Sequence, residues 1–455
     1  MDAKNHAAAV AAIILAAGKG TRMKSDLHKV LHPVAGRPML LHLLASVDAL
    51  APERVVVVTG AGREQVEAAV TPLGAVTALQ AEQLGTGHAV AQAQAALTGF
   101  EGAVLILYGD VPLVGTATMR RMLDRLAGDD APACVVLGFR PPDPAAYGRI
   151  IASPEGRIAR MVEYKDASTA ERAVDLCNSG LMAVRSADLF ALLARVGNDN
   201  AAGEYYLPDI VMLAAADGRT SVVIETDAAE VAGVNSRAEL AVVEGAWQQA
   251  RRADAMANGA TLIAPETVWF AHDTVIGRDV VIEPNVVFGP GTTIADGVTL
   301  RAFSHIEGAS VATGAIVGPY ARLRPGAVVR EDAHVGNFVE MKKAVLGKGA
   351  KANHLTYLGD AEVGAGANIG AGTITCNYDG YNKSLTRIGA GAFIGSNSAL
   401  VAPVSIGDGA LVAAGSVIID DVPADGFAIA RGRQETREDW APRFRAAAKA
   451  KKAGK

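Results

Sequence analysis

A glycine-rich loop near the start of the chain is the first feature whose residue types suggest chemistry. It reads LAAGKGTRM over residues 15–23. Its small residues, Leu15 aside, let backbone N–H groups approach a phosphate, and its basic residues bring positive charge to it. Met23 stands at the third glycine of a dinucleotide fingerprint, and the GK[ST] of a P-loop is missing. We therefore expect a phosphate-binding loop of another kind, built from Ala16, Ala17, Gly18 and Gly20 with Lys19, Arg22 and Lys29.

A carboxylate follows an apolar run at residues 104–108, where Tyr108-Gly109-Asp110 closes the run. The end of a buried strand is a place where a scaffold presents a ligand to a metal. Mg²⁺ prefers oxygen ligands and takes only one or two from protein. Asp110 is therefore a candidate ligand of Mg²⁺.

Polar residues also gather between residues 322 and 379, in a region that otherwise consists of small and apolar residues. A scaffold alone needs no such cluster, so we expect a second site there. Its members are Arg322, Arg324, Lys342, Lys343, His354, Tyr357, Asn368, Cys376, Asn377, Tyr378 and Asp379.

The element that must position this cluster is a repeat with an apolar residue at every sixth position, from residue 276 to residue 418. The runs are Ile276, Ile282, Phe288, Ile294, Leu300, Ile306; then, after one five-residue step, Val311 to Met341 in the same steps; then, after a further slip, Leu346, Val363 and Ile369; and, after an interruption, Ile388 to Ile418. A period of six fits neither an α-helix nor a plain strand. It predicts a parallel β-helix with three hexapeptides per coil. A β-sandwich of short strands is the alternative, but such strands seldom keep one period.

The first half must position the loop and Asp110, and it alternates strand-like and helix-like segments. Residues 7–17, 55–59, 104–108 and 134–137 read as strands, and residues 63–70, 89–97 and 116–126 read as helices. This order predicts a mostly parallel sheet covered by helices, with ligands at the carboxyl ends of the strands. A capping box, SRAE at residues 236–239, opens a connecting helix. We expect domains at residues 1–235 and 259–455, joined by a helix over residues 236–258.

Composition excludes several partners. Of 455 residues, 43 are Lys or Arg and 48 are Asp or Glu, a net charge of −5 that does not indicate nucleic acid. Cys134, Cys177 and Cys376 form no CxxC pair, which favours a reducing cytoplasm over a disulfide framework or a zinc site. The apolar run at residues 7–17 reads as the first strand, and no other apolar stretch reaches the roughly 20 residues of a membrane span.

The first half resembles the sugar-phosphate nucleotidyltransferases. Residues 15–29 are similar to their signature G-x-G-T-R-M followed by S-D-x-P-K, although His28 stands at the proline. The resemblance implies that Lys29 and Arg22 act on phosphates, that Gln80, Gly85 and Thr86 bind uracil, and that Asp110 and Asn235 hold Mg²⁺. It places the sugar of the UDP-sugar near Gly148, Glu163 and Asn178. The other residues it assigns to this ligand are Leu15, Ala16, Ala17, Gly18, Tyr108 and Gly109.

The second half is similar to the acetyltransferase half of the bifunctional N-acetylglucosamine-1-phosphate uridylyltransferase/glucosamine-1-phosphate N-acetyltransferases. The strings FVEMKK, HLTYLGDAEVG and NIGAGTITCNYDG carry this resemblance. It implies a left-handed β-helix, a homotrimer, and His354 as the general base, since imidazole suits proton transfer near neutral pH. It assigns glucosamine 1-phosphate to Arg324, Lys342, Tyr357 and Asn368. It assigns acetyl-CoA to Ala371, Asn377, Tyr378, Ser396, Ala414 and Arg431.

Together the two resemblances imply an enzyme that acetylates glucosamine 1-phosphate and then transfers uridylyl from UTP, with Mg²⁺, to the product. Two alternatives stay open at this point. One is a nucleotidyltransferase whose β-helix only regulates or assembles it, and the other is a non-enzymatic trimerising scaffold. The cluster at Arg324, Lys342 and His354 argues against the first, and Asp110 with the Gly18 loop against the second.

Overall fold

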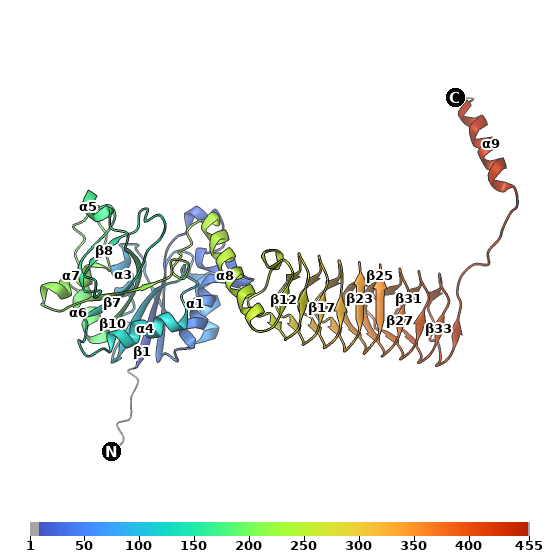
Figure 1. The fold of residues 1–455 in the computed structure, drawn as a ribbon, viewed down its shortest axis with the longest axis horizontal. Helices are drawn as coiled ribbons and strands as arrows, with labels where there is room; N and C mark the ends of the chain where they lie inside the picture. Colours follow the sequence, from blue (N-terminus) through green and yellow to red (C-terminus); the bar gives the residue numbers. More distant parts are fainter. Residues whose placement is uncertain (1–8, 454–455) are drawn as a thin grey trace, which may run out of the picture. The chain divides into compact units, whose positions relative to one another are not determined.

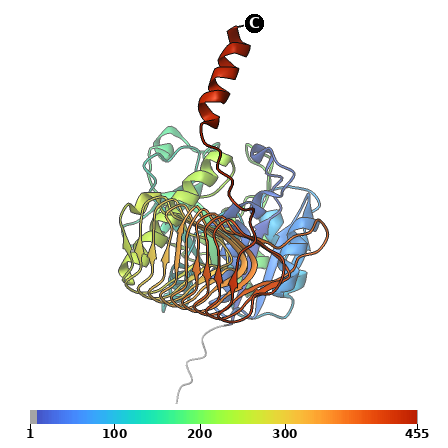
Figure 2. The same cartoon turned by 90° about the vertical axis from the view of Figure 1, so that its right-hand side faces the viewer.

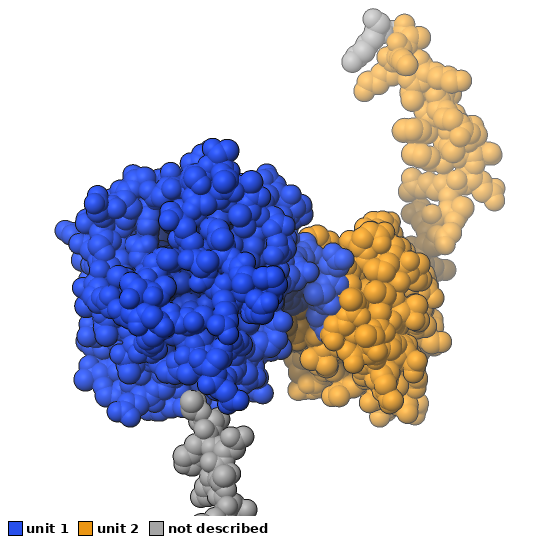
Figure 3. All heavy atoms as spheres, turned by 60° about the vertical axis from the view of Figure 1, so that its left-hand side comes forward, with its two compact units in different colours: residues 1–251 blue, residues 252–455 orange. Residues whose placement is uncertain are grey.

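The computed structural model describes residues 9–453, and the chain forms two compact units, Met1–Arg251 and Arg252–Lys455 (Figure 3). The division lies within helix α8 (Arg237–Ala257). Each unit has its own fold (Figure 1). Residues 7 and 8 of the first predicted strand lie outside the described residues.

The N-terminal unit is built on a nine-stranded mixed sheet whose central strands are parallel. The order is β11-β7-β10-β6-β1-β4-β5, with β8 and β9 attached to β10. Only β10 is antiparallel to its neighbours β6 and β7 on this path. The strands are β1 (Val10–Ala16), β4 (Arg54–Thr59), β5 (Val76–Leu79), β6 (Ala103–Tyr108), β7 (Cys134–Phe139), β8 (Arg149–Ala152), β9 (Ile158–Val162), β10 (Cys177–Arg185) and β11 (Val222–Thr226).

Helices cover both faces of this sheet (Figure 1), and alternate residues of β1 enter two different cores. Ile13 and Leu15 belong to one core, and Ile14 and Ala16 to the other, as a strand buried on both faces requires. The helices are α1 (Met39–Asp48), α2 (Arg63–Val70), α3 (Thr86–Ala91), α4 (Thr116–Leu126), α5 (Thr169–Arg172), α6 (Ser186–Leu193) and α7 (Asp209–Ala216), with short 3₁₀ turns η1 (Thr21–Met23), η2 (Lys29–Leu31), η3 (Thr71–Leu73) and η4 (Ala95–Leu97). A two-stranded ribbon joins β2 (Pro33–Val34) to β3 (Arg37–Pro38).

One predicted helix is interrupted. Residues 89–97 are predicted to be a continuous helix, but α3 ends at Ala91 and η4 begins at Ala95. The backbone N–H groups of Gln92, Ala93 and Gln94 bond to the carbonyl oxygens three residues earlier, at 3.2, 3.0 and 3.1 Å. Bonds of this span belong to a 3₁₀ turn, so the chain tightens between α3 and η4.

The C-terminal unit is a parallel β-helix, seen along its coils in Figure 2. Strands pair in parallel with residues 18 positions ahead, as in Val281 with Thr299, which confirms three hexapeptides per coil. The offset falls to 17 where the repeat slips, as in Thr293 with Ser310. The predicted inward residues are buried from Ile282 through Ile418, and Ile276 on the first coil is partly buried.

Its strands line the faces of the coil. Ten form one sheet: β12 (Thr261–Leu262), β14 (Val281–Ile282), β17 (Thr299–Leu300), β20 (Ile316–Val317), β23 (His334–Asn337), β25 (Lys351–His354), β27 (Asn368–Ile369), β30 (Phe393–Ile394), β33 (Leu411–Val412) and β35 (Phe427–Ala428). Fourteen form the remaining sheet: β13 (Val275–Ile276), β15 (Val287–Phe288), β16 (Thr293–Ile294), β18 (His305–Ile306), β19 (Ser310–Val311), β21 (Arg322–Leu323), β22 (Val328–Val329), β24 (Glu340–Leu346), β26 (Tyr357–Val363), β28 (Ile374–Cys376), β29 (Thr386–Ile388), β31 (Ala399–Val401), β32 (Val404–Ile406) and β34 (Val417–Ile418). The 3₁₀ turn η5 (Pro265–Thr267) lies in the first coil, and helix α9 (Trp440–Ala453) has no buried residue.

Candidate active sites

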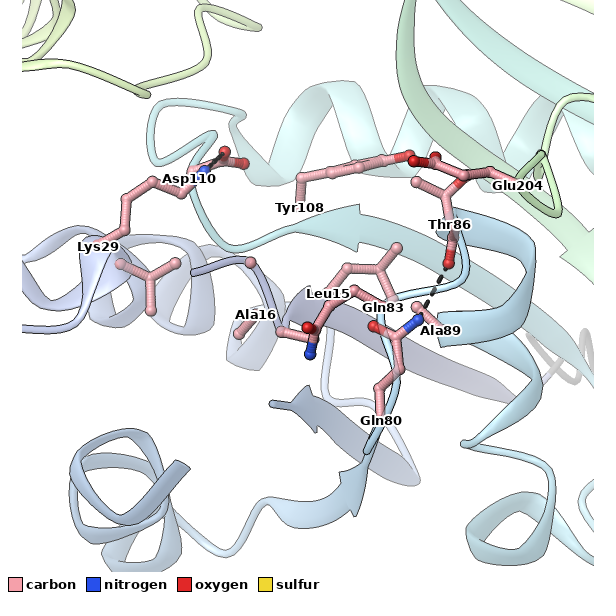
Figure 4. Close-up of a pocket in the computed structure, with 14 residues that line it drawn as sticks. Leu15, Ala16, Lys29, Gln80, Gln83, Thr86, Ala89, Tyr108, Asp110 and Glu204 are labelled. Atoms are coloured by element: carbon pink, nitrogen blue, oxygen red, sulfur yellow. Dashed lines mark hydrogen bonds and ion pairs between the residues drawn. The ribbon is translucent and has the colours of Figure 1, made fainter. Parts of the chain in front are cut away.

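A cavity of about 290 Å³ opens at the carboxyl ends of β1 and β6 (Figure 4). Parallel neighbours end at the same edge of a sheet, and Leu15 is in register with Tyr108. Ten residues of the predicted nucleotide site line this cavity: Leu15, Ala16, Ala17, Gly18, Lys29, Gln80, Gly85, Thr86, Tyr108 and Asp110. Four further lining residues were not predicted from the sequence: Val30, Gln83, Ala89 and Glu204. Glu204 lies 94 positions after Asp110, the nearest predicted residue in the lining, and no local pattern points to it.

Lys29 reaches the metal-ligand candidates through a gap that only glycine leaves. Gly20 has φ +60°, and a Cβ at Gly20 would lie 2.5 Å from the Lys29 Cβ. The Lys29 Nζ atom donates to Asp110 Oδ2 (2.5 Å) and to Asn235 Oδ1 (3.1 Å). The Lys29 and Asp110 side chains are only 11% and 17% exposed. Asp110 and Asn235 are 125 positions apart in sequence, yet their side-chain oxygens both accept hydrogen bonds from the Lys29 ammonium group.

This arrangement fits a divalent metal with few protein ligands. A carboxylate oxygen and an amide oxygen converge on a positive charge, and both are ligands of the type that Mg²⁺ prefers. Within residues 9–453 no group of three or more His, Cys, Asp and Glu side chains is arranged to hold a metal ion. The pair Asp110 and Asn235 remains the candidate.

Helix α8 fixes Asn235. The Asn235 backbone N–H donates to Glu239 Oε2 (2.6 Å), and Val234 N–H donates to the Asp110 carbonyl (2.9 Å). The predicted capping box is only half formed, because Ser236 Oγ accepts from Glu239 N–H (3.3 Å) but the Glu239 carboxylate turns to Asn235. The glutamate that starts the helix thereby also holds a metal-ligand candidate in place.

The three predicted sugar contacts form a second group, outside the lining of the cavity. Asn178 N–H donates to the Gly148 carbonyl (2.9 Å), and a Cβ at Gly148 would lie 3.3 Å from the Glu163 carboxylate. Burial raises the pKa of Glu163, and nearby Asp209 adds to this. Burial likewise raises the pKa of Tyr108, which lines the cavity, and the Glu163 charge is a further cause.

Two of the predicted basic residues lie elsewhere. Arg22 is exposed on η1 and does not line the cavity. Lys19 lines a neighbouring hollow of about 390 Å³ that shares Gln80 and Gln83 with the cavity. Gly109 is also absent from the lining, because its N–H is bonded to the Leu15 carbonyl (2.9 Å).

In the C-terminal unit, His354 ends β25 and is exposed. Its Nδ1 atom lies 2.7 Å from Asn337 Oδ1, and the two residues are in register on β25 and β23. An amide oxygen accepts a hydrogen bond, so Nδ1 carries the proton and Nε2 keeps its lone pair for a substrate. Asn337 was not predicted from the sequence. It lies 17 residues before His354, which places it on the preceding coil.

A cluster of cations lies near His354 on another face of the coil. Arg324 donates to Glu340 (2.7 Å), which raises the pKa of Arg324. Contact with the Lys383 ammonium lowers the pKa of Lys342, and the Arg324 charge acts in the same direction. Three cations held together favour an anion such as a phosphate. Lys383 was not predicted either, although its position in the loop that interrupts the hexapeptides could have pointed to it.

The predicted contacts Tyr357 and Asn368 lie on opposite sides of the same corner. Tyr357 is in register with Glu340 on the face that carries the cations. Asn368 is in register with Lys351 on the strand that ends at His354. Asn377 is 8% exposed and its amide donates to Asp360, while Tyr378 is 58% exposed. The structure therefore places Asn377 as a support and Tyr378 as a surface residue of the interrupting loop.

Four of the six predicted coenzyme residues, Ala371, Ser396, Ala414 and Arg431, form a column along one corner of the coils, starting at His354. Gly372 N–H donates to the His354 carbonyl (3.2 Å), and Asn397 N–H donates to the Ala371 carbonyl (2.7 Å). The next coil continues with Gly415 N–H to the Ser396 carbonyl (2.8 Å), and Arg431 Nη1 donates to the Ala414 carbonyl (2.7 Å). The small side chains of Ala371, Ser396 and Ala414 therefore line this corner between the His354 imidazole and the Arg431 guanidinium.

Two family models match the chain. The model described as "MobA-like NTP transferase domain" matches residues 12–174. The model "Bacterial transferase hexapeptide (six repeats)" matches residues 273–308 and 385–420, as expected for a left-handed hexapeptide β-helix. Each match falls on one of the two folds described above.

Curated relatives match almost the whole chain. "Bifunctional protein GlmU" of Sphingopyxis alaskensis is 67% identical over 444 residues, which cover 98% of both chains. The protein of the same name from Rhizorhabdus wittichii is 71% identical over 445 residues, again 98% of both chains. That of Novosphingobium aromaticivorans is 69% identical over 447 residues, 98% of this chain and 99% of its own. In the part of the chain that the structure covers, none of the helices has the length and apolar character needed to cross a lipid bilayer.

Proposed function

The chain belongs to the family of bifunctional GlmU proteins, and from this premise we propose that each of its units holds one complete set of catalytic residues. It is a uridylyltransferase and an acetyltransferase of UDP-N-acetylglucosamine synthesis. The observation that carries the assignment is the presence of two separate polar groups, one around Lys29 and Asp110 and one around His354, on two different folds. A monofunctional enzyme with a regulatory β-helix would have no physical need for the second group.

The N-terminal cavity holds UTP and N-acetylglucosamine 1-phosphate. The sugar phosphate oxygen attacks the α-phosphorus of UTP, a bond to the β-phosphate oxygen breaks, and pyrophosphate leaves. Both reactants are anionic, so positioning and neutralisation supply most of the catalysis. Lys29 and the backbone of the Gly18 loop face the phosphates, while exposed Arg22 approaches from solvent.

We propose Mg²⁺ as the metal of this site, held by Asp110 and Asn235. When bound, it supplies positive charge to the phosphates. Lys29 then exchanges its bonds to the two oxygens for bonds to the substrate. The supporting observation is that both oxygens accept hydrogen bonds from the Lys29 ammonium group.

The C-terminal site transfers the acetyl group. The amine of glucosamine 1-phosphate attacks the thioester carbonyl of acetyl-CoA, His354 Nε2 takes the proton from the amine, and the C–S bond breaks to release coenzyme A. We place the substrate phosphate at Arg324, Lys342 and Lys383, because three cations gather there. We place the coenzyme along the column Ala371, Ser396 and Ala414, with its phosphates near Arg431.

We propose a homotrimer formed through the β-helix. Phe303, Tyr320 and Phe338 stack on one corner with ring centroids 4.9 and 5.1 Å apart, and Leu355 continues the row. Each of the four is about half exposed or more and has a positive φ, a conformation that large side chains rarely adopt. A row of strained, exposed apolar side chains beside His354 suits contact with another copy. Light scattering should give three chains per particle, and Tyr320→Asp should lower that mass.

The test of the two activities offers glucosamine 1-phosphate, acetyl-CoA, UTP and Mg²⁺ together and then omits each in turn. We expect UDP-N-acetylglucosamine only from the full mixture. Without UTP, N-acetylglucosamine 1-phosphate should accumulate, and without acetyl-CoA no acetylated sugar should form. Given N-acetylglucosamine 1-phosphate directly, the enzyme should need only UTP and Mg²⁺. UDP-sugar formation without acetyl transfer would leave the monofunctional alternative standing.

The free cysteines and these substrates are consistent with a cytoplasmic enzyme.

A further inference from the structure

The side chain of Gln80 is held in one orientation by the first turn of α3. Its Nε2 atom donates to the Gly85 carbonyl oxygen (3.1 Å) and lies 3.1 Å from Nδ1 of His88. Gln80 is only 3% exposed, so there is little room for its amide to turn. In Figure 4 the Gln80 nitrogen points to its bonded carbonyl, and the amide oxygen points away from that bond, toward Leu15.

The protonation of His88 follows from its two neighbours. Nδ1 accepts from Gln80, so the proton of the neutral ring is on Nε2. The Gln92 amide lies 3.1 Å from Nε2. The atom at that distance is Gln92 Nε2, which also donates to the His88 carbonyl (3.0 Å). A ring that donates from Nε2 requires the amide oxygen, so the half-buried Gln92 amide turns and gives up its bond to that carbonyl, while the buried Gln80 amide keeps its bond to Gly85. The tilted ring of Tyr205, 6.3 Å from the imidazole, packs on the other side.

We propose that His88 is a positioning residue that fixes the Gln80 amide and thereby makes the nucleotide site select uracil over cytosine. Uracil presents an N–H donor at ring position 3, whereas cytosine presents an acceptor there. With its nitrogen occupied by Gly85 and His88, Gln80 offers only its oxygen to a base. That oxygen accepts from uracil and meets the lone pair of cytosine. His88 itself is not among the residues that line the cavity.

This inference rests on the proposed function, because it assumes that Gln80 meets the base of UTP. If the amide were free to turn, its NH₂ group could serve cytosine equally well. A site built around one hydrogen-bonding pattern rejects the wrong pattern because a buried polar group is left unpaired. Holding the amide in place is therefore what turns a glutamine into a selective residue.

The experiment compares kcat/KM for UTP and for CTP, with N-acetylglucosamine 1-phosphate and Mg²⁺, in wild type, His88→Leu and His88→Asn. Asparagine carries an oxygen at the branch position of the imidazole Nδ1 and keeps the acceptor, whereas leucine has none. We expect His88→Leu to lower the ratio of UTP to CTP by roughly tenfold or more, and His88→Asn to retain most of it. Gln94→Leu, an exposed change later in the same segment, serves as the control and should leave the ratio unchanged.

A double variant separates positioning from a direct role. In a Gln80→Ala background, His88→Leu should cause no further loss of selectivity, because no amide remains to be held. Circular dichroism and urea unfolding of each preparation report that the N-terminal unit, which holds His88, is folded. An unchanged ratio in His88→Leu, an equal loss in His88→Asn, or a further loss in the double variant overturns the inference. A wild-type enzyme that makes no UDP-sugar from UTP would instead overturn the proposed function.

Discussion

The Nδ1 atom of His354 lies 2.7 Å from the Oδ1 atom of Asn337 on the neighbouring strand of the same face. The contact leaves Nε2 free to take a proton. It also means that the base is oriented by an amide, whereas the Glu340 carboxylate is bonded to Arg324.

Asn337→Ala should lower kcat for acetyl transfer by roughly tenfold, because the ring loses the partner that fixes its tautomer. Uridylyl transfer by the same protein should be unchanged. Asn337→Asp keeps an acceptor at the same place and should retain more activity than the alanine variant. Equal losses in the two variants would count against an orienting role.

The two sites should fail independently. His354→Ala should reduce acetyl transfer by roughly a hundredfold or more, the usual contribution of a general base, and leave uridylyl transfer intact. Asp110→Ala should do the reverse. Coupled assays of each half reaction on folded protein decide this, and loss of both activities from either single change would contradict the two-site assignment.

Removal of divalent metal should stop only one half reaction. With EDTA in excess, uridylyl transfer should cease and acetyl transfer should continue, because Asp110 and Asn235 belong to one compact unit and His354 to the other. Adding back Mg²⁺ should restore the rate. Acetyl transfer that also stops would show a metal requirement that the C-terminal site does not explain.

Lys383→Met should raise KM for glucosamine 1-phosphate by roughly tenfold while changing KM for acetyl-CoA little. A phosphate gains from each charged donor, and Lys383 is in contact with Lys342. The matched control is Lys348→Met, an exposed lysine of the same β-helix that lies outside the predicted polar cluster. If both variants behave alike, the general charge of the surface explains the effect.

His28→Leu should make the folded chain less sensitive to acid. His28 is 7% exposed, and neither ring nitrogen has a hydrogen-bond partner. Burial lowers the pKa of His28 below its ordinary value of 6.5, and the Lys29 charge acts in the same direction. Below pH 6.5 the unfolded chain therefore binds more protons than the folded chain at this residue, so its contribution to stability is present above pH 6.5 and is lost as the pH falls.

Urea unfolding of the full chain between pH 7.5 and 5.5 measures this. Wild type should lose more of its free energy of unfolding over that range than His28→Leu. His28→Phe controls for side-chain volume and should resemble the leucine variant. A wild-type slope equal to that of both variants would show that His28 does not titrate differently in the folded chain.

The sequence by itself determined the repetitive half almost completely. An apolar residue every six positions can be buried only if the chain turns at fixed intervals, so the coil, its inward residues and its slips were all predictable. The phosphate loop was predictable for a related reason: small residues and cations close together in sequence are also close in space, as Gly18, Gly20 and Lys29 are.

The tertiary structure alone decided how distant residues meet. Asp110 follows β6 and Asn235 precedes α8, and the fold brings both side chains to the Lys29 ammonium group. Glu204 reaches the cavity from a loop that no local pattern marks. Asn337, Lys383 and His88 were not recognised because each acts by orienting or accompanying another side chain, and orientation is set by packing. Residue types and spacing specify which groups can do chemistry, but only the folded backbone fixes which polar atoms face each other at hydrogen-bond distance.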